Sequence, residues 1–331
     1  MSEKIRVIQY GLGPIGSGVA CHVVERTGLE LVGGVDIDPA KVGRDVGDVI
    51  GLGRDLGFPV TKTLGEILGR TGADVVIHTT RSYFDLFKDQ ILEILAAGLD
   101  VVSTSEELSF PWSDHAGEAQ EIDAAARAAG KTVLGTGVNP GFLMDALPLF
   151  LTAICQQVER IEVTRIMNAS LRRGPFQAKI GSGMTVEAFE AKMAEGRMGH
   201  VGLPESIGML FDTLGHTLVD YQSAVEPVVA ERLVETDFFQ VQPGQVRGLK
   251  QVARAYDEAG EFVTLTFIAA LDSAEDGDTI KITGKPSLEV KLQGTNGDLA
   301  TVAIAVNAVR RVHGAPPGLV TMRDLPIVTY G

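Results

Sequence analysis

Residues 5–16 read Ile5-Arg6-Val7-Ile8-Gln9-Tyr10-Gly11-Leu12-Gly13-Pro14-Ile15-Gly16, a short β-prone run that ends in a Gly-x-Gly-x-x-Gly turn. An apolar stretch from Gly18 follows, so the pattern predicts a strand, a turn and a helix. In such a turn the glycines permit a tight bend, close approach of a pyrophosphate, and close packing of helix on strand. We therefore predict that a dinucleotide pyrophosphate binds at the helix N-terminus, against Gly11, Gly13, Pro14, Ile15 and Gly16.

A second predicted strand, Leu31-Val32-Gly33-Gly34-Val35-Asp36, ends in an acid. Asp36 lies about twenty residues after Gly16, the spacing of a carboxylate that accepts hydrogen bonds from ribose hydroxyls. Asp36 would repel the 2′-phosphate of NADP unless Lys41 or Arg44 lies over the ribose. We expect both NAD and NADP to be accepted. The alternative is a structural glycine turn followed by a solvated Asp36.

The composition is that of an ordinary globular protein, with 331 residues, 45% hydrophobic and 22% charged, which is long enough for two domains. The formal net charge of −14 argues against nucleic acid or an anionic membrane surface as the main partner. No apolar run approaches the length of a membrane span, and no basic segment precedes one, so we expect a cytoplasmic protein. Cys21 and Cys155 lack metal or redox spacing and are expected to be buried structural thiols. No metal site is expected.

Strand and helix patterns alternate over the first ~140 residues, as in a doubly wound parallel sheet. The apolar run at 73–80 predicts a strand buried on both faces, and 100–104 and 132–135 predict two more. Helices are predicted over 84–97 and 114–129, and a capping box at Thr63 and Glu66 predicts a short one. We expect a turn and short helix at 39–43 and an irregular surface at 47–57.

The pattern changes after Pro140. Alternating apolar residues at 158–167 predict a strand with one face open to solvent, and further strands are predicted at 228–241, 246–257, 261–271 and 287–293. Helices are predicted at 185–195 and 203–214, and a last helix capped by Asn296 should return to the first domain. We therefore predict an α/β protein. Its Rossmann domain would span 1–140 and be completed by 296–331; an α+β domain with a mixed or antiparallel sheet, for substrate binding and dimerisation, would span 141–295.

Two adjacent acids, Glu106 and Glu107, follow the strand at 100–104, where the cofactor end of the sheet is expected. The apolar side chains of Leu108, Phe110 and Trp112 flank them, which predicts a partly dry pocket that raises the pKa of a glutamate toward neutrality. A general acid/base beside the hydride acceptor would result. The alternative is a pair of solvated loop carboxylates.

Three motifs together resemble the native amine dehydrogenases and 2,4-diaminopentanoate dehydrogenases, over nearly the whole chain. They are the glycine turn, Ser105-Glu106-Glu107-Leu108-Ser109-Phe110-Pro111, and Gly135-Thr136-Gly137-Val138-Asn139-Pro140-Gly141-Phe142. The resemblance implies a dihydrodipicolinate-reductase-like fold, a homodimer and a catalytic glutamate in the pair. It also implies NAD(P)-dependent oxidative deamination of amines and, in reverse, reductive amination of ketones or aldehydes with ammonia. Homoserine dehydrogenases resemble the same loop, with their catalytic lysine at the place of Glu106, which favours Glu106 over Glu107. The paired histidines and nearby lysine of true dihydrodipicolinate reductases are absent.

Further site residues follow from the loops at the predicted carboxyl edge. We predict that Thr79, Thr80, Asn139 and Gly141 position the nicotinamide, although each could be a turn residue. The predicted substrate pocket consists of Trp112, Phe142, Met144, Asn168, Phe176 and His200. His200 or His216 could act as a base or be structural, and Arg165, Arg172 and Arg173 could clamp a substrate carboxylate or be surface charge.

Three functions agree with these residues. The first is an amine dehydrogenase that acts on small aliphatic amines and carbonyls. The second is a diamine or amino-acid dehydrogenase of the 2,4-diaminopentanoate type, which needs an additional polar or acidic group in its pocket. The third is a non-catalytic NAD(P) sensor, which would have no use for acid/base residues such as Glu106 and Glu107.

Overall fold

The computed structural model describes residues 4–196 and 198–330, which form two compact units. The first unit comprises Met1–Ala146 and Asn296–Gly331, and the second comprises Leu147–Thr295. The predicted domain limits, after residue 140 and before residue 296, lie close to these, and the ligand that each domain binds stays a prediction. Across the described part of the chain, no helix has both the length and the apolar character needed to cross a bilayer.

Six parallel strands form the sheet of the first unit, in the order β14-β5-β4-β3-β1-β2. The order reverses at β1, and open α/β sheets bind ligands outside the carboxyl ends of the strands at such a reversal. The predicted doubly wound parallel sheet is confirmed. Its strands are β1 (Ile5–Tyr10), β2 (Leu29–Val35), β3 (Val75–His78), β4 (Asp100–Ser103), β5 (Thr132–Gly135) and β14 (Gly318–Val320).

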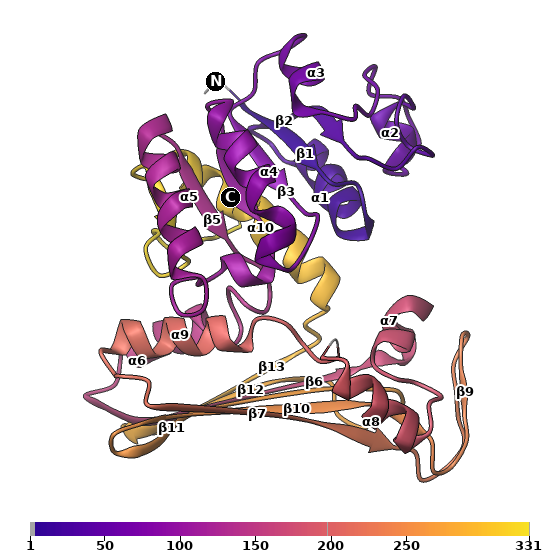
Figure 1. The fold of residues 1–331 in the computed structure, drawn as a ribbon, viewed down its shortest axis with the longest axis vertical. Coiled ribbons are helices and arrows are strands. Elements are labelled where there is room, and N and C mark those ends of the chain that lie inside the picture. Colours follow the sequence, from indigo (N-terminus) through magenta and orange to yellow (C-terminus); the bar gives the residue numbers. More distant parts are fainter. Residues whose placement is uncertain (1–3, 197, 331) are drawn as a thin grey trace. The chain divides into compact units, whose positions relative to one another are not determined.

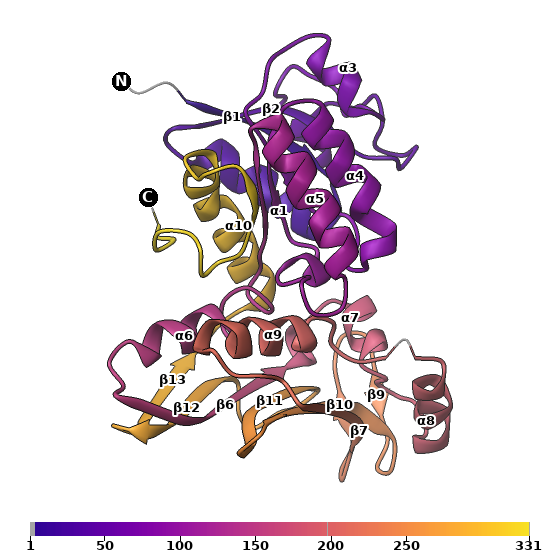
Figure 2. The same ribbon diagram turned by 60° about the vertical axis from the view of Figure 1, so that its left-hand side comes forward.

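Helices cover both faces of this sheet (Figures 1 and 2). Helices α1 (Pro14–Glu25) and α10 (Gly297–His313) share one core with Val7 of β1, whereas α4 (Phe84–Ala96) and α5 (Ala116–Ala129) share a second core with Ile8. Neighbouring residues of a strand point to opposite faces, so a strand buried on both faces is apolar throughout. Helix α10 belongs to the first unit, as predicted, and the Asn296 side chain caps it by accepting from the N–H groups of Asp298 and Leu299.

A mixed sheet forms the second unit, in the order β13-β12-β6-β11-β10-β7, and only β6 and β11 pair in parallel within it. This confirms the predicted mixed sheet. Its strands are β6 (Gln157–Asn168), β7 (Asp220–Val229), β10 (Val246–Asp257), β11 (Gly260–Ala270), β12 (Gly277–Lys285) and β13 (Leu288–Gln293), beside a short ribbon of β8 (Val234–Glu235) and β9 (Gln240–Val241). The helices are α6 (Ala146–Thr152), α7 (Gly174–Lys179), α8 (Val186–Ala194) and α9 (Leu203–Leu214).

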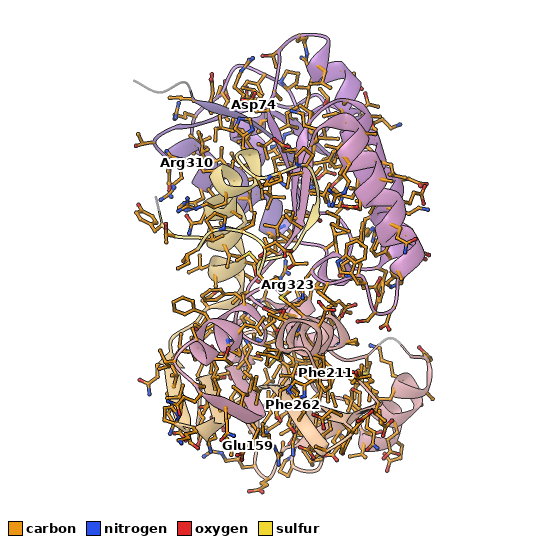
Figure 3. The ribbon with its side chains drawn as sticks, turned by 90° about the vertical axis from the view of Figure 1, so that its left-hand side faces the viewer. Asp74, Glu159, Phe211, Phe262, Arg310 and Arg323 are labelled. Atoms are coloured by element: carbon orange, nitrogen blue, oxygen red, sulfur yellow. The ribbon has the colours of Figure 1, made fainter. Side chains whose placement is uncertain are left out.

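Helix α9 packs on the sheet through aromatic side chains. The pairing of β10 with β11 shifts by one residue at Ala255, so Phe262 and Val263 both lie opposite it. The ring of Phe262, at this bulge, lies 5.3 Å from the ring of Phe211 of α9 between ring centres, and the two rings are nearly perpendicular (Figure 3). Both rings are almost fully buried.

The strand predicted at 228–241 is wrong. Strand β7 runs earlier, over Asp220–Val229, and the residues after it form the separate β8–β9 ribbon. Strand β7 lies at the sheet edge with few buried side chains, so it has little apolar alternation to detect. Strand β12 was also not predicted, because Ile280 and Ile282 are its only large apolar side chains.

Three smaller expectations also need correction. Residues 39–43 form turns only, and the helix lies at α2 (Val46–Val49), inside the stretch predicted to be irregular, where the Asp45 carboxylate caps it by accepting from Gly47 N–H. The hydroxyl of Thr63 donates to the Glu66 carboxylate at 2.8 Å instead of capping the amides of α3 (Leu64–Leu68). Cys21 and Cys155 are half-buried rather than buried; Cys21 lies beside the buried stripe of α1 and not within it.

Candidate active site

The three glycines of the turn between β1 and α1 differ in the space around them. Gly11 has φ +90°, and an added Cβ at Gly16 would lie 1.9 Å from the Gly11 carbonyl oxygen, so neither position accepts a side chain. An added Cβ at Gly13 would meet no atom within 4 Å. The backbone at Gly13 therefore faces open space at the N-terminus of α1, where the free amides and the helix dipole attract phosphate.

The side chains of Thr79 and Gln9 stabilise the turn by hydrogen bonds to its backbone. The Thr79 hydroxyl donates to the Gly11 carbonyl oxygen at 2.9 Å, and the Gln9 amide donates to the same oxygen and to the Thr79 hydroxyl, each at 2.8 Å. Thr79 was predicted to contact the nicotinamide. These bonds support a role in shaping the turn.

Asp36 lies at the end of β2, next to the turn. One of its oxygens accepts from Leu12 N–H and from the Lys41 ammonium, both at 2.9 Å, and the other accepts from Asp38 N–H at 2.9 Å. Burial raises the pKa of Asp36, but the hydrogen bonds from Asp38, Lys41 and Leu12 together outweigh it and leave the pKa below its ordinary value. Arg44 is instead paired with exposed Asp48.

The two glutamates lie on a 3₁₀ turn, η1 (Glu106–Leu108), directly after β4. Glu107 points to the N-terminus of α4: its carboxylate accepts from Phe84 N–H at 2.5 Å and lies 3.3 Å from His115 Nε2. A Cβ on Gly135 of β5 would lie 2.3 Å from the Leu108 backbone, so this glycine lets the turn pack against the neighbouring strand. The Glu107 carboxylate therefore stabilises the N-terminus of α4. Glu106, the preceding residue of the turn, is half-buried.

Several buried polar atoms gather at this edge. Within the described residues, side-chain oxygens of Gln9, Ser105, Ser109 and Thr136 are buried and have no hydrogen-bond partner. Such atoms are rare in folded proteins and usually pair with a ligand or water. Together with the open backbone at Gly13 and the acceptor at Asp36, they fit a nicotinamide dinucleotide. No group of three or more potential metal-ligating side chains occurs in 4–196 and 198–330.

The loop after β5 is shaped by Gly141, which has φ +116° and would place a Cβ 2.5 Å from Gly137 N. Its N–H donates to the buried Asp145 carboxylate at 2.7 Å. The Val138 N–H donates to the Thr301 hydroxyl of α10, and Asn139 is 8% exposed. The loop is thus fixed at the carboxyl edge by backbone contacts.

The predicted substrate residues divide between the two units. In the first unit, Trp112 and Phe142 are half-buried, and Met144 is fully buried. Phe110, on the same loop as Trp112, lies under the Arg323 guanidinium, at 5.2 Å. In the second unit, the remaining three have partners: Asn168 caps the turn η2 (Ala169–Leu171), Phe176 lies 4.7 Å under the Arg172 guanidinium, and His200 stacks on Phe267 at 4.6 Å.

The other predicted histidine and arginines are also placed, with Arg173 exposed at the N-cap position of α7. His216 stacks on Phe262 at 3.8 Å and binds the Asp257 carboxylate at 2.7 Å, as a structural histidine would. Arg165 is only 3% exposed, so the alternative of a surface charge is wrong for it. It lies on the β6 face that is buried, beside Asp278 of β12, with Nη1 and Oδ1 3.6 Å apart.

Sequence reasoning missed the buried His78 and Ser103 and the half-buried Gln90, whose side chains are joined through His78. His78 and Ser103 are the last residues of β3 and β4 and lie opposite each other in the register. Two polar residues that end adjacent apolar strands were the available signal.

These features define a class of protein, a two-unit dehydrogenase with a Rossmann-type nucleotide domain. Residues 142–330 match the family model described as 2,4-diaminopentanoate dehydrogenase C-terminal domain, and residues 5–105 match dihydrodipicolinate reductase, N-terminus. A 2,4-diaminopentanoate dehydrogenase of Acetoanaerobium sticklandii is 31% identical, covering 98% of this chain and 94% of the relative. The chain belongs to the 2,4-diaminopentanoate dehydrogenase family.

More distant relatives agree with this assignment. An amine dehydrogenase of Streptomyces virginiae is 24% identical over 98% of this chain and 96% of the relative. The solved structure of an amine dehydrogenase from Mycobacterium smegmatis superposes with a TM-score of 0.87, at 26% identity, covering 99% of this chain and 97% of that one. The resemblance inferred from the motifs is confirmed, and the chain is an NAD(P)-dependent oxidoreductase that acts on CH–NH₂ donors and takes a small-molecule substrate.

Proposed function

We propose that Glu106 is the acid/base of an amine dehydrogenase that deaminates amines oxidatively and aminates carbonyls reductively with ammonia. The observation behind this assignment is the geometry of Glu107, whose carboxylate is committed to the α4 N-terminus and His115. Its neighbour Glu106 is half-buried on the same turn, directly after β4, at the edge of the sheet where open α/β folds bind their ligands.

The chemistry needs a group that changes protonation state several times. In the oxidative direction, Glu106 takes a proton from the substrate ammonium, and the α-carbon then loses a hydride to leave an iminium. Glu106 releases that proton to solvent and, as a carboxylate again, accepts a proton from the water that adds to the iminium carbon and passes it to the nitrogen. It then accepts the hydroxyl proton of this adduct as ammonia leaves and the carbonyl forms. A carboxylate suits this sequence because it also stabilises the cationic iminium, which a lysine would repel.

The nicotinamide nucleotide, when bound, supplies the hydride acceptor or donor. We propose that the glycine turn and Pro14-Ile15 hold its pyrophosphate, that Asp36 accepts from its ribose, and that Thr80, Asn139 and Gly141 lie against the nicotinamide. The support is the open backbone at Gly13 and the unpartnered hydroxyls at the same edge.

The test compares Glu106→Gln with Glu107→Gln. NADH oxidation is measured with a ketone or aldehyde panel, with and without high ammonia, and NADH affinity is measured separately by nucleotide fluorescence. We expect oxidation to need both carbonyl and ammonia, and Glu106→Gln to lose it by at least about a hundredfold with NADH affinity unchanged. Glu107→Gln should retain activity in the fraction that stays folded. Full activity in Glu106→Gln would refute the assignment, and oxidation without ammonia would indicate an alcohol-type dehydrogenase.

One observation favours a second candidate, a substrate that carries charge besides the reacting amine. Arg165 Nη1 and Asp278 Oδ1 are buried, and neither has a hydrogen-bond partner. A buried pair that is incompletely bonded is costly, and the carboxylate and second ammonium of a diamino acid could bond to both groups. We would compare 2-aminopentane with 2,4-diaminopentanoate, the compound named for the relative from A. sticklandii. Higher kcat/KM for the diamino acid would favour this candidate, and the reverse result would favour simple amines.

We also propose a homodimer that works in the cytoplasm. In Figures 1 and 2, α6 and α9 lie on one face of the second sheet, and the opposite face has no labelled helix among the described residues. That face, in the unit proposed for dimerisation, offers a surface for a second copy. Light scattering after gel filtration tests the dimer, since a monomer mass at micromolar concentration would exclude it. Cell fractionation tests the location.

A further inference from the structure

Four polar residues at the ends of β3 and β4 and Gln90 of α4 form one continuous hydrogen-bonded chain. The Ser105 N–H donates to the Ser103 hydroxyl at 3.1 Å, and that hydroxyl lies 2.9 Å from His78 Nδ1. On the other side of the ring, His78 Nε2 lies 2.7 Å from the Gln90 amide oxygen and 2.8 Å from the Thr80 hydroxyl oxygen, and the Thr80 hydroxyl donates to the Gln90 oxygen at 2.7 Å. Every link is within ordinary hydrogen-bond distance.

The partners determine the tautomer of His78. The Gln90 amide oxygen is an acceptor only, so Nε2 carries the hydrogen, which points to the Gln90 and Thr80 oxygens, and Nδ1 accepts from the Ser103 hydroxyl. The ring is fully buried, and burial lowers the pKa of His78 to about 4, against the smaller opposing effect of the bond to Gln90. At neutral pH the imidazole is therefore uncharged, with one donor and one acceptor.

This chain ends on both sides at residues of the proposed site. Ser105 directly precedes Glu106, so the bond to its amide fixes the start of the turn that presents the proposed acid/base. Thr80 is a proposed contact of the nicotinamide. Its hydroxyl hydrogen is used by Gln90 and one lone pair of Oγ1 faces His78 Nε2, so the second lone pair of Oγ1 is left to accept, as from the carboxamide N–H₂ of the nicotinamide.

We infer that His78 is a positioning residue that holds the Thr80 hydroxyl and the Ser105–Glu106 segment in a fixed arrangement through Gln90 and Ser103. This inference rests on the proposed function for the roles of Glu106 and Thr80. His78 itself contacts no substrate, and its effect reaches the chemistry through its two neighbours.

We call the two sides of this chain its arms: one runs from His78 to Ser103 and Ser105, and the other from His78 to Gln90 and Thr80. Four variants separate the effects of the two arms. His78→Gln places an amide near the Nε2 position and keeps the arm to Gln90 and Thr80, while it loses the arm to Ser103. His78→Asn places an amide oxygen near the Nδ1 position and keeps the arm to Ser103. Ser103→Ala removes the same arm as His78→Gln. His78→Phe removes both arms but keeps a ring beside Tyr10 and Phe87, whose ring centres lie 5.7 and 6.3 Å away.

Each variant is measured for Tm, for the Kd of NADH by fluorescence, and for kcat at saturating NADH. We expect His78→Gln and Ser103→Ala to lower kcat about tenfold with Kd within about twofold of wild type. His78→Asn should raise the Kd about fivefold with a smaller change in kcat. His78→Phe should do both. A purely structural role would lower Tm and change both parameters in parallel in all variants, which would overturn the inference.

The experiment also distinguishes this inference from the proposed function. Glu106→Gln is measured alongside, and if it retains full activity, the role of Glu106 fails whatever the His78 variants do. The Kd values of NADH still show whether the arm that ends at Thr80 contributes to nucleotide binding, because binding is measured without turnover. If His78→Phe does not fold, His78→Gln and His78→Asn provide the same contrast.

Discussion

The Lys41 ammonium lies 2.9 Å from the Asp36 carboxylate and 3.1 Å from the Leu12 carbonyl oxygen, so it bridges the end of β2 and the glycine turn. Asp36 is the residue that we propose accepts from the ribose, and this cation is its ion-pair partner. A carboxylate alone would reject a 2′-phosphate, whereas the pair offers an acceptor for a 2′-hydroxyl and a cation for a 2′-phosphate.

Lys41→Met should therefore weaken the binding of NADPH more than the binding of NADH. Removal of the cation leaves Asp36 uncompensated beside the 2′-phosphate, and we expect the Kd of NADPH to rise at least about tenfold, the equivalent of one charge-assisted hydrogen bond. The Kd of NADH should change by about twofold or less. Fluorescence titration with both nucleotides measures this. Arg44→Met is the matched control, because Arg44 pairs with exposed Asp48; an equal effect of the two substitutions would contradict the prediction.

Gly16→Ala should lower the stability of the fold, whereas Gly13→Ala should weaken the binding of NADH and leave the stability unchanged. The added methyl at Gly16 would overlap the Gly11 carbonyl oxygen, so this variant should lower Tm by several degrees. The methyl at Gly13 meets no protein atom, so this variant should keep the wild-type Tm and lose NADH affinity about tenfold, because it occupies space that the pyrophosphate needs. Thermal unfolding and fluorescence titration measure the two effects. Unchanged affinity in Gly13→Ala would place the pyrophosphate elsewhere.

The sequence predicted the first unit well because its signals are local. Strand, turn and helix follow one another in residues 5–25, and strands buried on both faces give apolar runs such as 75–78 that need no knowledge of their partners. The second unit was less predictable: edge strand β7 has little alternation, and β12 depends on pairing with β6, more than a hundred residues away. Pairing over such distances leaves no local pattern.

The different surroundings of Glu106 and Glu107 also could not be predicted from the sequence. Both belong to the same apolar loop, and only the fold shows that the N-terminus of α4 approaches Glu107. The pairing of Arg165 with Asp278 was hidden for the same reason, because the two lie on strands far apart in sequence. Neighbouring residues with identical side chains differ here only in what the rest of the chain places beside them.

Glu107→Ala should destabilise the protein more than it impairs the chemistry. The carboxylate accepts from the first amide of α4, as an N-cap does, and loss of such a cap costs about 1–2 kcal/mol. Urea unfolding at pH 7 measures the loss, with Glu118→Gln as a control that removes an exposed acid in the first turn of α5. Equal stability of Glu107→Ala and wild type would show that the contact with Phe84 N–H contributes nothing.

Asp257 should stabilise the second unit in a pH-dependent way. Burial raises its pKa, but hydrogen bonds from His216 and from the N–H groups of Ala259 and Gly260 outweigh this and hold the pKa below the ordinary 3.8. Because the folded pKa is lower than the unfolded one, the stabilisation is fully present above about pH 4 and is lost as the pH falls through the folded pKa. Asp257→Asn should cost about 1–2 kcal/mol at pH 7, through the weakened bonds to His216 and the turn, and much less at pH 2–3. Urea unfolding at both pH values tests this, with the exposed neighbour Glu258→Gln as control. A stability difference that is the same at both pH values would show that the charge of Asp257 is not what holds the β10–β11 turn to His216.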